Sequence, residues 1–320
     1  MKVKLTLVVF LILKAFAAQS CPMLGNPDKV QSMSLRGAKV YALFTPHLFG
    51  EDELVLGALS AKTRPEIKKK LLQLLDDNKA IIDSEKADSA QITSLAKSGE
   101  IAWIGIEASA EEMRSGISIA SQVEDYRATK KLYQEFLGGV KKTSDLMYLI
   151  FPADIIARAE NSEAFAKIRT IPLDSHLPKQ QMFKTVEEAM VLSQSLFELG
   201  SKMHLIAFKD FETLESLYQN ALLNSAPLDE QTIVAATGGI KNAETKTLAI
   251  KYLEAANKFL TLSAKRDAYA ANAIVGLSGN GLVTFGSAHG PGISSRLNIV
   301  CLMDTANPWR WKNRIQPKVK

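Results

Sequence analysis

Short apolar runs stand toward both ends of the chain, and a long stretch with helical spacing separates them. Residues 39–45, 101–106 and 282–285 are rich in β-branched and aromatic side chains, which is typical of buried strands. From about 111 to 277 the apolar residues recur three and four positions apart, which indicates helices. The pattern predicts an α/β fold with a central, largely parallel sheet and a large helical insertion between the early and late strands.

Local signals place some of the helices more closely. Residues 65–77 have an amphipathic pattern with a proline at the start, which predicts a helix there. Ser109 and Glu112 have the spacing of a capping box. Thr185 and Glu188 have the same spacing, so we expect another helix to begin at Thr185.

The first 20 residues are organised like a secretory signal peptide. Basic residues precede the apolar run Leu5 to Leu13, and small residues follow it; cleavage after Ala17 and cleavage after Ser20 fit equally well. The run is too short to span a bilayer, and Lys14 interrupts it. We expect an exported protein, periplasmic or secreted, with no transmembrane segment after signal cleavage. A retained N-terminal anchor is the alternative.

The charge balance argues against a nucleic-acid-binding protein. The formal charge of the 320 residues is +5, and removal of the three signal lysines leaves +2. What basic excess remains gathers in a tail, residues 306–320, which we interpret as solvated or loosely docked; weak attachment to an anionic surface is the alternative. The hydrophobic content of 47% is enough for a full core in a domain spanning 21–305.

The two cysteines, Cys21 and Cys301, form an even pair in an exported chain. We therefore expect a disulfide between the start of the mature protein and a late strand. Residues 18–21 also resemble a lipobox, although they lack its large aliphatic residue, so a lipid-modified Cys21 is the competing interpretation.

Three polar side chains follow predicted strands. His47 comes after the first strand, Glu107 after the second, and His289 lies in the glycine-rich turn after the late strand. Ligands of open α/β sheets bind at the carboxyl ends of parallel strands, so we expect these side chains to lie together. The competing interpretation is that His289 is an ordinary loop histidine between glycines.

Other polar residues fit structural roles. His176 and His204 belong to no recognisable constellation, and we interpret them as ordinary surface or half-buried residues. The segment 244–277 has a helical pattern without a strong break, and Arg266 and Asp267 within it fit a helix-terminal surface pair.

The C-terminal part of the chain resembles a known family. RDAYAANAIVGL and GLVTFGSAHGPGISSRL, at 266–277 and 281–297, together resemble the C-terminal signature of the TraB/Tiki group. That group more distantly resembles the ChaN-like haem-binding proteins and the erythromycin esterases. These proteins have an early Gly-x-x-His, an acid after a later strand, an arginine on a late helix and a final Gly-x-x-His.

Most of these motif positions are present here. The matching residues are Glu107, Arg266, Gly286 and His289. The first motif departs from the family pattern, because Phe44 stands in the glycine place before His47. The resemblance covers residues 39–110 and 265–300, and the middle of the chain is similar only in being helical.

The resemblance implies a site of His47, Glu107, Arg266 and His289. His47, Glu107 and His289 would suit a divalent ion such as Zn²⁺, Mn²⁺ or Co²⁺ with an open position for water. Without a metal the same three residues would activate water by general base catalysis, with Arg266 stabilising negative charge. The sequence does not choose between these mechanisms.

The resulting hypothesis is an exported hydrolase that acts on a peptide, ester or amide bond of a small-molecule or peptide substrate. The alternative is a non-enzymatic binding protein, with the helical middle walling a pocket for haem or another small apolar ligand. A third interpretation is that the chain is a structural remnant of the fold and carries out no chemistry. The absence of the motif glycine at Phe44 supports it. The substrate and the oligomeric state stay open.

Overall fold

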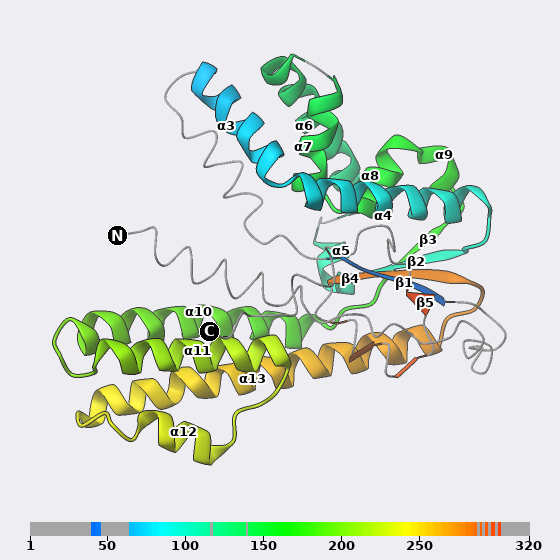
Figure 1. The fold of residues 1–320 in the computed structure, drawn as a ribbon. Coiled ribbons are helices and arrows are strands. Elements are labelled where there is room, and N and C mark those ends of the chain that lie inside the picture. The colour runs from blue at the N-terminus through cyan, green and yellow to red at the C-terminus, as the bar shows by residue number, and fades with distance from the viewer. Residues whose placement is uncertain are drawn as a thin grey trace.

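Five parallel strands form one sheet, and helices cover both of its faces (Figure 1). The computed structural model describes residues 40–45, 64–115, 118–138, 140–286, 289, 292–293, 296–297 and 300–301. The strands are β1 (Val40–Thr45), β2 (Trp103–Ile106), β3 (Arg169–Pro172), β4 (Gly281–Gly286) and β5 (Val300–Cys301). The helices are α3 (Arg64–Asp77), α4 (Lys79–Lys97), α5 (Ala110–Arg114), α6 (Ile119–Leu137), α7 (Val140–Ile150), α8 (Ala153–Glu160), α9 (Ser162–Phe165), α10 (His176–Ser195), the π-helix η2 (Leu196–Ser201), α11 (Phe208–Asn224), α12 (Glu230–Thr237) and α13 (Ala243–Val275).

The strand order is β3-β2-β4-β1-β5, and every neighbouring pair is parallel. Val40 and Trp103 are both in register with Gly281, so β1, β2 and β4 begin at the same level. The residues that follow β2 and β4 therefore lie at one edge of the sheet. The expected α/β fold, with a helical insertion between early and late strands, is confirmed.

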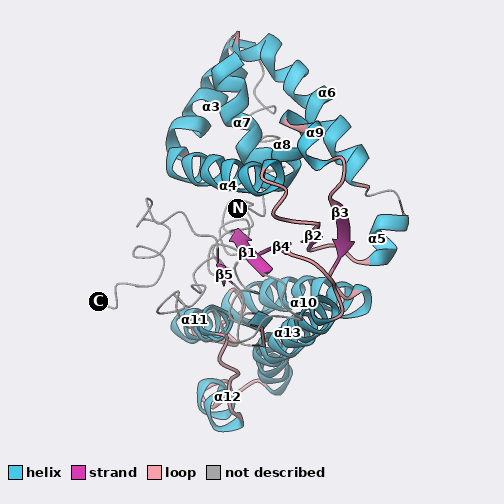
Figure 2. Ribbon diagram, turned by 90° about the vertical axis from the view of Figure 1, so that its right-hand side faces the viewer, coloured by secondary structure: helices cyan, strands magenta, loops and turns pink. Residues whose placement is uncertain are grey.

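The sheet lies between two layers of helices (Figure 2). Alternate residues of its strands face opposite layers. One face packs on α4 and α8 through Leu43, Ile104, Ile106 and Leu282. The other face packs on the last third of α13 through Val40, Ala42, Trp103, Val283 and Phe285. These strands are apolar on both faces because both are covered, which explains their continuous hydrophobic runs.

Beyond the sheet, α10, η2, α11, α12 and the first part of α13 form a helical arm with its own apolar core. The long helices of the arm lie side by side and extend away from the sheet (Figure 1). The 33-residue α13 runs from the arm to the underside of the sheet without interruption. Residues in its middle therefore lie where the arm meets the sheet.

Two local features differ from expectation. β3 lies inside the stretch that the pattern predicts to be helical, and its four residues, RTIP, are too few and too polar to stand out. The helix start expected at Thr185 is wrong, because α10 begins at His176 and Thr185 is buried inside it. The Thr185 hydroxyl donates to the carbonyl of Gln181 instead of capping.

Several predictions fall on residues outside the described part of the chain. These are the signal peptide, the basic tail, His47 and Cys21; Cys301 lies in β5, but its pairing stays a prediction, as does the lipidated alternative. Among the described helices, none combines the length and apolar character needed to cross a bilayer.

Candidate active site

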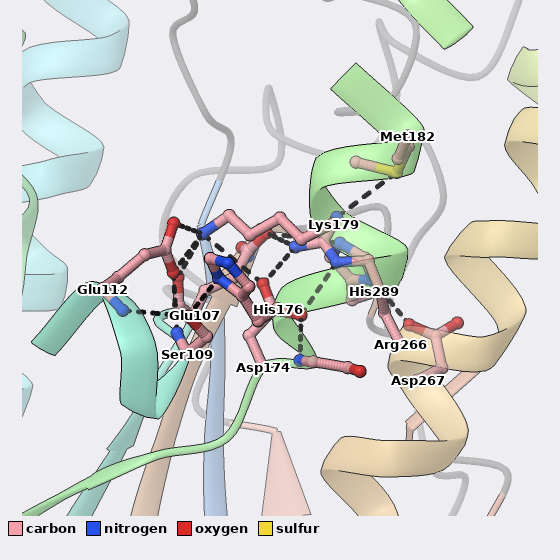
Figure 3. Close-up of polar contacts among 12 residues, drawn as sticks. Glu107, Ser109, Glu112, Asp174, His176, Lys179, Met182, Arg266, Asp267 and His289 are labelled. Atoms are coloured by element: carbon pink, nitrogen blue, oxygen red, sulfur yellow. Dashed lines mark hydrogen bonds and ion pairs between the residues drawn. The ribbon is translucent and has the colours of Figure 1, made fainter. Parts of the chain in front are cut away.

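Glu107 directly follows β2 and is fixed from two sides (Figure 3). One carboxylate oxygen accepts the backbone N–H of Gly286, at the end of β4, at 2.7 Å. The other accepts Nη2 of Arg266 at 2.5 Å. The glycine of the final Gly-x-x-His motif thus holds the acid of the neighbouring strand.

Arg266 lies in the middle of α13 and is only 1% exposed. Its Nε and Nη2 donate to the two oxygens of Asp174, at 2.9 and 2.6 Å, and Nη1 lies 3.3 Å from the sulfur of Met182. Burial alone would lower the pKa of Arg266, but the hydrogen bonds and charges of Asp174 and Glu107 raise it above its ordinary value. The interpretation of Arg266 as part of a surface pair is wrong.

Lys179 connects the start of α10 to the residues that follow β2 and β3. Lys179, in the first turn of α10, donates to the backbone carbonyl of Glu107 at 3.1 Å. Its ammonium also pairs with the carboxylates of Glu112, at 3.1 Å, and Asp174, at 3.5 Å. Ser109 and Glu112 form the predicted capping box of α5, which fixes Glu112 in place.

His289 lies between two carboxylates. Its Nδ1 is 2.5 Å from Asp267 and its Nε2 is 3.4 Å from the Glu107 oxygen that also binds Arg266. The residue is 4% exposed. Burial on its own lowers the pKa of His289, but the charge of Glu107 and the hydrogen bond to Asp267 outweigh it and raise the pKa to about 9. At neutral pH His289 is therefore an imidazolium.

Gly292 is packed against the Asp267 side chain. A Cβ atom on Gly292 would lie 1.8 Å from a carboxylate oxygen of Asp267. Any larger residue at this position would therefore force Asp267 to shift from its contact with His289.

The structure brings Glu107, Arg266 and His289 together, as the sequence predicts, and adds Asp174, Lys179 and Asp267, which the sequence analysis missed. No spacing rule links these three to the motif. Asp267 has only its place beside Arg266 as a signal, and Asp174 only its place after a very short strand. Of the other histidines, His176 is half-buried beside Ser109, and His204 is exposed in the turn between η2 and α11.

The described residues alone do not make up a metal centre. No group of three or more His, Cys, Asp or Glu side chains suited to an ion occurs in the described part of the chain. Glu107 and His289 are spaced like two ligands of one tetrahedral ion, which lie about 3.4 Å apart. However, the same Glu107 oxygen already accepts the Arg266 guanidinium. The three-ligand set that includes His47 stays a prediction.

No known protein family, curated protein or solved structure matches the chain. The resemblance to the TraB/Tiki group therefore rests on the motif residues alone. Any conclusion about function has to come from the geometry of the cluster, which consists of Glu107, Glu112, Asp174, Lys179, Arg266, Asp267 and His289.

Proposed function

We propose that the protein is a hydrolase of ester or amide bonds, peptide bonds included, in which His289 activates water without a metal ion. The observation that carries the proposal is the chain Asp267–His289–Glu107 at the carboxyl edge of the sheet. A carboxylate at Nδ1 fixes the ring orientation and stabilises the imidazolium that forms when Nε2 accepts a proton.

In the proposed reaction, water lies against Nε2 of neutral His289 and the Glu107 carboxylate. Nε2 takes one proton from the water, whose oxygen forms a bond to the substrate carbonyl carbon. The bond from that carbon to the leaving oxygen or nitrogen breaks, and the leaving group takes the proton from Nε2. A carboxylic acid and an alcohol or amine result, and His289 returns to its neutral form.

Arg266 has a positioning role in this mechanism. Its guanidinium is buried and holds Glu107 and Asp174, so it orients the carboxylate that orients the water. The sequence-based expectation that Arg266 itself stabilises the transition state would require it to leave these partners.

The test is hydrolysis of p-nitrophenyl acetate and of a fluorogenic peptide library by the purified protein and by His289→Ala. We expect the variant to lose about 10²- to 10⁴-fold in kcat/KM, the usual contribution of a general base. For the wild type, kcat/KM should rise with pH up to about 9, because the neutral imidazole is the active form. His204→Asn is the control variant.

One outcome would replace the proposed mechanism, and another would replace the proposed function. If EDTA abolishes hydrolysis, the ion-dependent mechanism with His47, Glu107 and His289 replaces the metal-free one. If the wild type hydrolyses no member of the panel, the enzyme hypothesis is wrong and the binding-protein alternative takes its place.

A further inference from the structure

The cations of the cluster are already occupied. The donors of Arg266 point at Asp174, Glu107 and Met182, and its side chain is 1% exposed. Lys179 is 14% exposed and divides its ammonium among two carboxylates and a carbonyl. Arg266 cannot turn toward a substrate oxygen without breaking its buried contacts to Asp174 and Glu107, which costs several kcal/mol on general grounds. Lys179 would have to leave the Glu107 carbonyl and Glu112. A donor for the substrate carbonyl has to come from elsewhere.

His176 stands at the same edge of the sheet. It is the first residue of α10, four positions after β3, and its Nδ1 is 3.2 Å from the hydroxyl oxygen of Ser109. Ser109 follows Glu107 by two residues, and Lys179, one turn after His176, binds the Glu107 carbonyl. Figure 3 accordingly draws the His176 ring among the residues of the cluster.

The contacts of Ser109 bear on which nitrogen of His176 carries the proton. The Ser109 hydroxyl oxygen accepts the backbone N–H of Glu112 at 3.1 Å and is fully buried. Two acceptors lie within reach of its own hydrogen, the Glu112 carboxylate and Nδ1 of His176. When the hydroxyl donates to Nδ1, the ring carries its hydrogen on Nε2, which makes no hydrogen bond to a described residue and can donate to a ligand.

We infer that His176 is a further catalytic residue, whose Nε2–H donates to the carbonyl oxygen of a substrate that is uncharged at its scissile group, an ester or amide. This inference rests on the proposed hydrolase function. A donor aimed at the oxygen where negative charge develops stabilises the transition state.

The charges of the cluster define the substrate class. Glu107, Glu112, Asp174 and Asp267 outnumber the cations Arg266, Lys179 and protonated His289. With its cations occupied, the cluster offers a neutral donor beside an excess of carboxylates. Such a site repels a phosphate ester and accepts a neutral carbonyl.

The experiment compares the wild type with His176→Ala, His176→Gln and the control His204→Asn, on p-nitrophenyl acetate and p-nitrophenyl phosphate. Asparagine suits position 204 because His204 has a positive φ of 56°, which Asn tolerates. We expect His176→Ala to lose about 10²- to 10³-fold in kcat with little change in KM, as for one oxyanion donor. His176→Gln, which keeps an N–H donor, should recover part of this loss, and the phosphate should not be hydrolysed.

A second readout does not depend on turnover. The ¹⁵N chemical shifts of the His176 ring should report the Nε2–H tautomer in the wild type and a mixture of tautomers in Ser109→Ala. Finding the Nδ1–H tautomer in the wild type would overturn the inference even if His176→Ala failed to fold.

The possible results distinguish a failure of this inference from a failure of the proposed hydrolase function. If His289→Ala abolishes hydrolysis while both His176 variants stay within twofold of the wild type, His176 is not the donor and the hydrolase proposal stands. Preferential hydrolysis of the phosphate overturns the substrate class. If the wild type hydrolyses neither compound, or His289→Ala has no effect, the proposed function and the inference both fail.

Discussion

Two buried arginine–aspartate pairs occur in the described chain, and they are built differently. Arg266 at the sheet edge makes a two-point contact with Asp174, at 2.9 and 2.6 Å, and a further bond to Glu107. Arg158 in α8 lies 3.9 Å from Asp154, its partner one turn earlier in the same helix. Both arginines are buried, so burial alone does not distinguish them.

The hydrogen bonds of the two pairs differ. Nε and Nη2 of Arg158 have no hydrogen-bond partner among the described residues, and the guanidinium lies over the ring of Phe165 at 5.3 Å. Burial lowers the pKa of Arg158 and raises that of Asp154, so both groups are less stable in their charged forms. For Arg266 the partners outweigh burial, and its pKa is raised.

The difference shows which buried charges belong to a candidate site. A network in which acids, bases and a histidine converge from α10, α13 and two strand ends can hold a reactive group in place. An isolated pair within one helix, without a hydrogen bond between its partners, offsets less of the cost of burial. The following predictions test this distinction, from the largest expected effect to the smallest.

The largest expected loss follows from Arg266→Met. This change leaves Asp174, which is 2% exposed, and Glu107 without their guanidinium. We expect the free energy of unfolding to fall by about 3–5 kcal/mol, the usual effect of breaking a buried pair from one side. Urea unfolding followed by circular dichroism measures it. A loss below about 1 kcal/mol would mean that the acids find other partners.

The second prediction concerns pH and His289. Its pKa is about 9 in the folded protein and about 6.5 when unfolded, so it stabilises the fold fully below pH 6.5. This contribution declines between pH 6.5 and 9 and is lost above that range. It amounts to about 3 kcal/mol at its maximum, one pKa unit being about 1.4 kcal/mol.

The measurement is the difference in unfolding free energy between the wild type and His289→Gln at a series of pH values. The difference should shrink as the pH rises from 6 to 9.5, and groups that titrate in both proteins cancel. A difference that stays constant would show that the folded protein does not hold the imidazolium.

How far the sequence could predict this cluster depends on the distance of each interaction along the chain. The capping box joins Ser109 and Glu112, which are three positions apart, so the sequence alone indicates it. The meeting of Glu107 and His289 follows from a general rule, that parallel strands end at one edge. These parts of the site could be predicted.

The partners that orient the cluster could not be predicted in the same way. Asp174 binds an arginine 92 residues later, after a strand of four residues with no apolar run. Asp267 looks like half of a surface pair until the fold places α13 under the sheet. Their roles depend on helix positions that the hydrophobic pattern alone does not specify.

The third prediction uses the turn after β4. In Gly292→Ala the new methyl group would overlap the carboxylate of Asp267, which must then move away from His289. We expect a loss of about 1–3 kcal/mol in unfolding free energy, typical of overpacking, together with reduced hydrolysis. Gly239→Ala is the matched control, because its nearest neighbouring atom would be 3.7 Å away. Equal effects of the two changes would argue against a tight contact at Gly292.

The smallest expected effect comes from the pair in α8. Replacing both partners, in Asp154→Leu/Arg158→Leu, removes two costly buried charges and adds apolar side chains to a helix whose residues 153–158 are all buried. We expect the unfolding free energy to stay within about 1 kcal/mol of the wild type or to rise above it, since such replacements are often neutral or stabilising. The corresponding change at the sheet edge, Asp174→Leu/Arg266→Leu, should instead destabilise the protein, because Glu107 and Lys179 lose partners that they share with this pair. If the two double variants have the same effect on the unfolding free energy, measured by urea unfolding, the two pairs are equivalent. The additional contacts of the network at the sheet edge then add no stability.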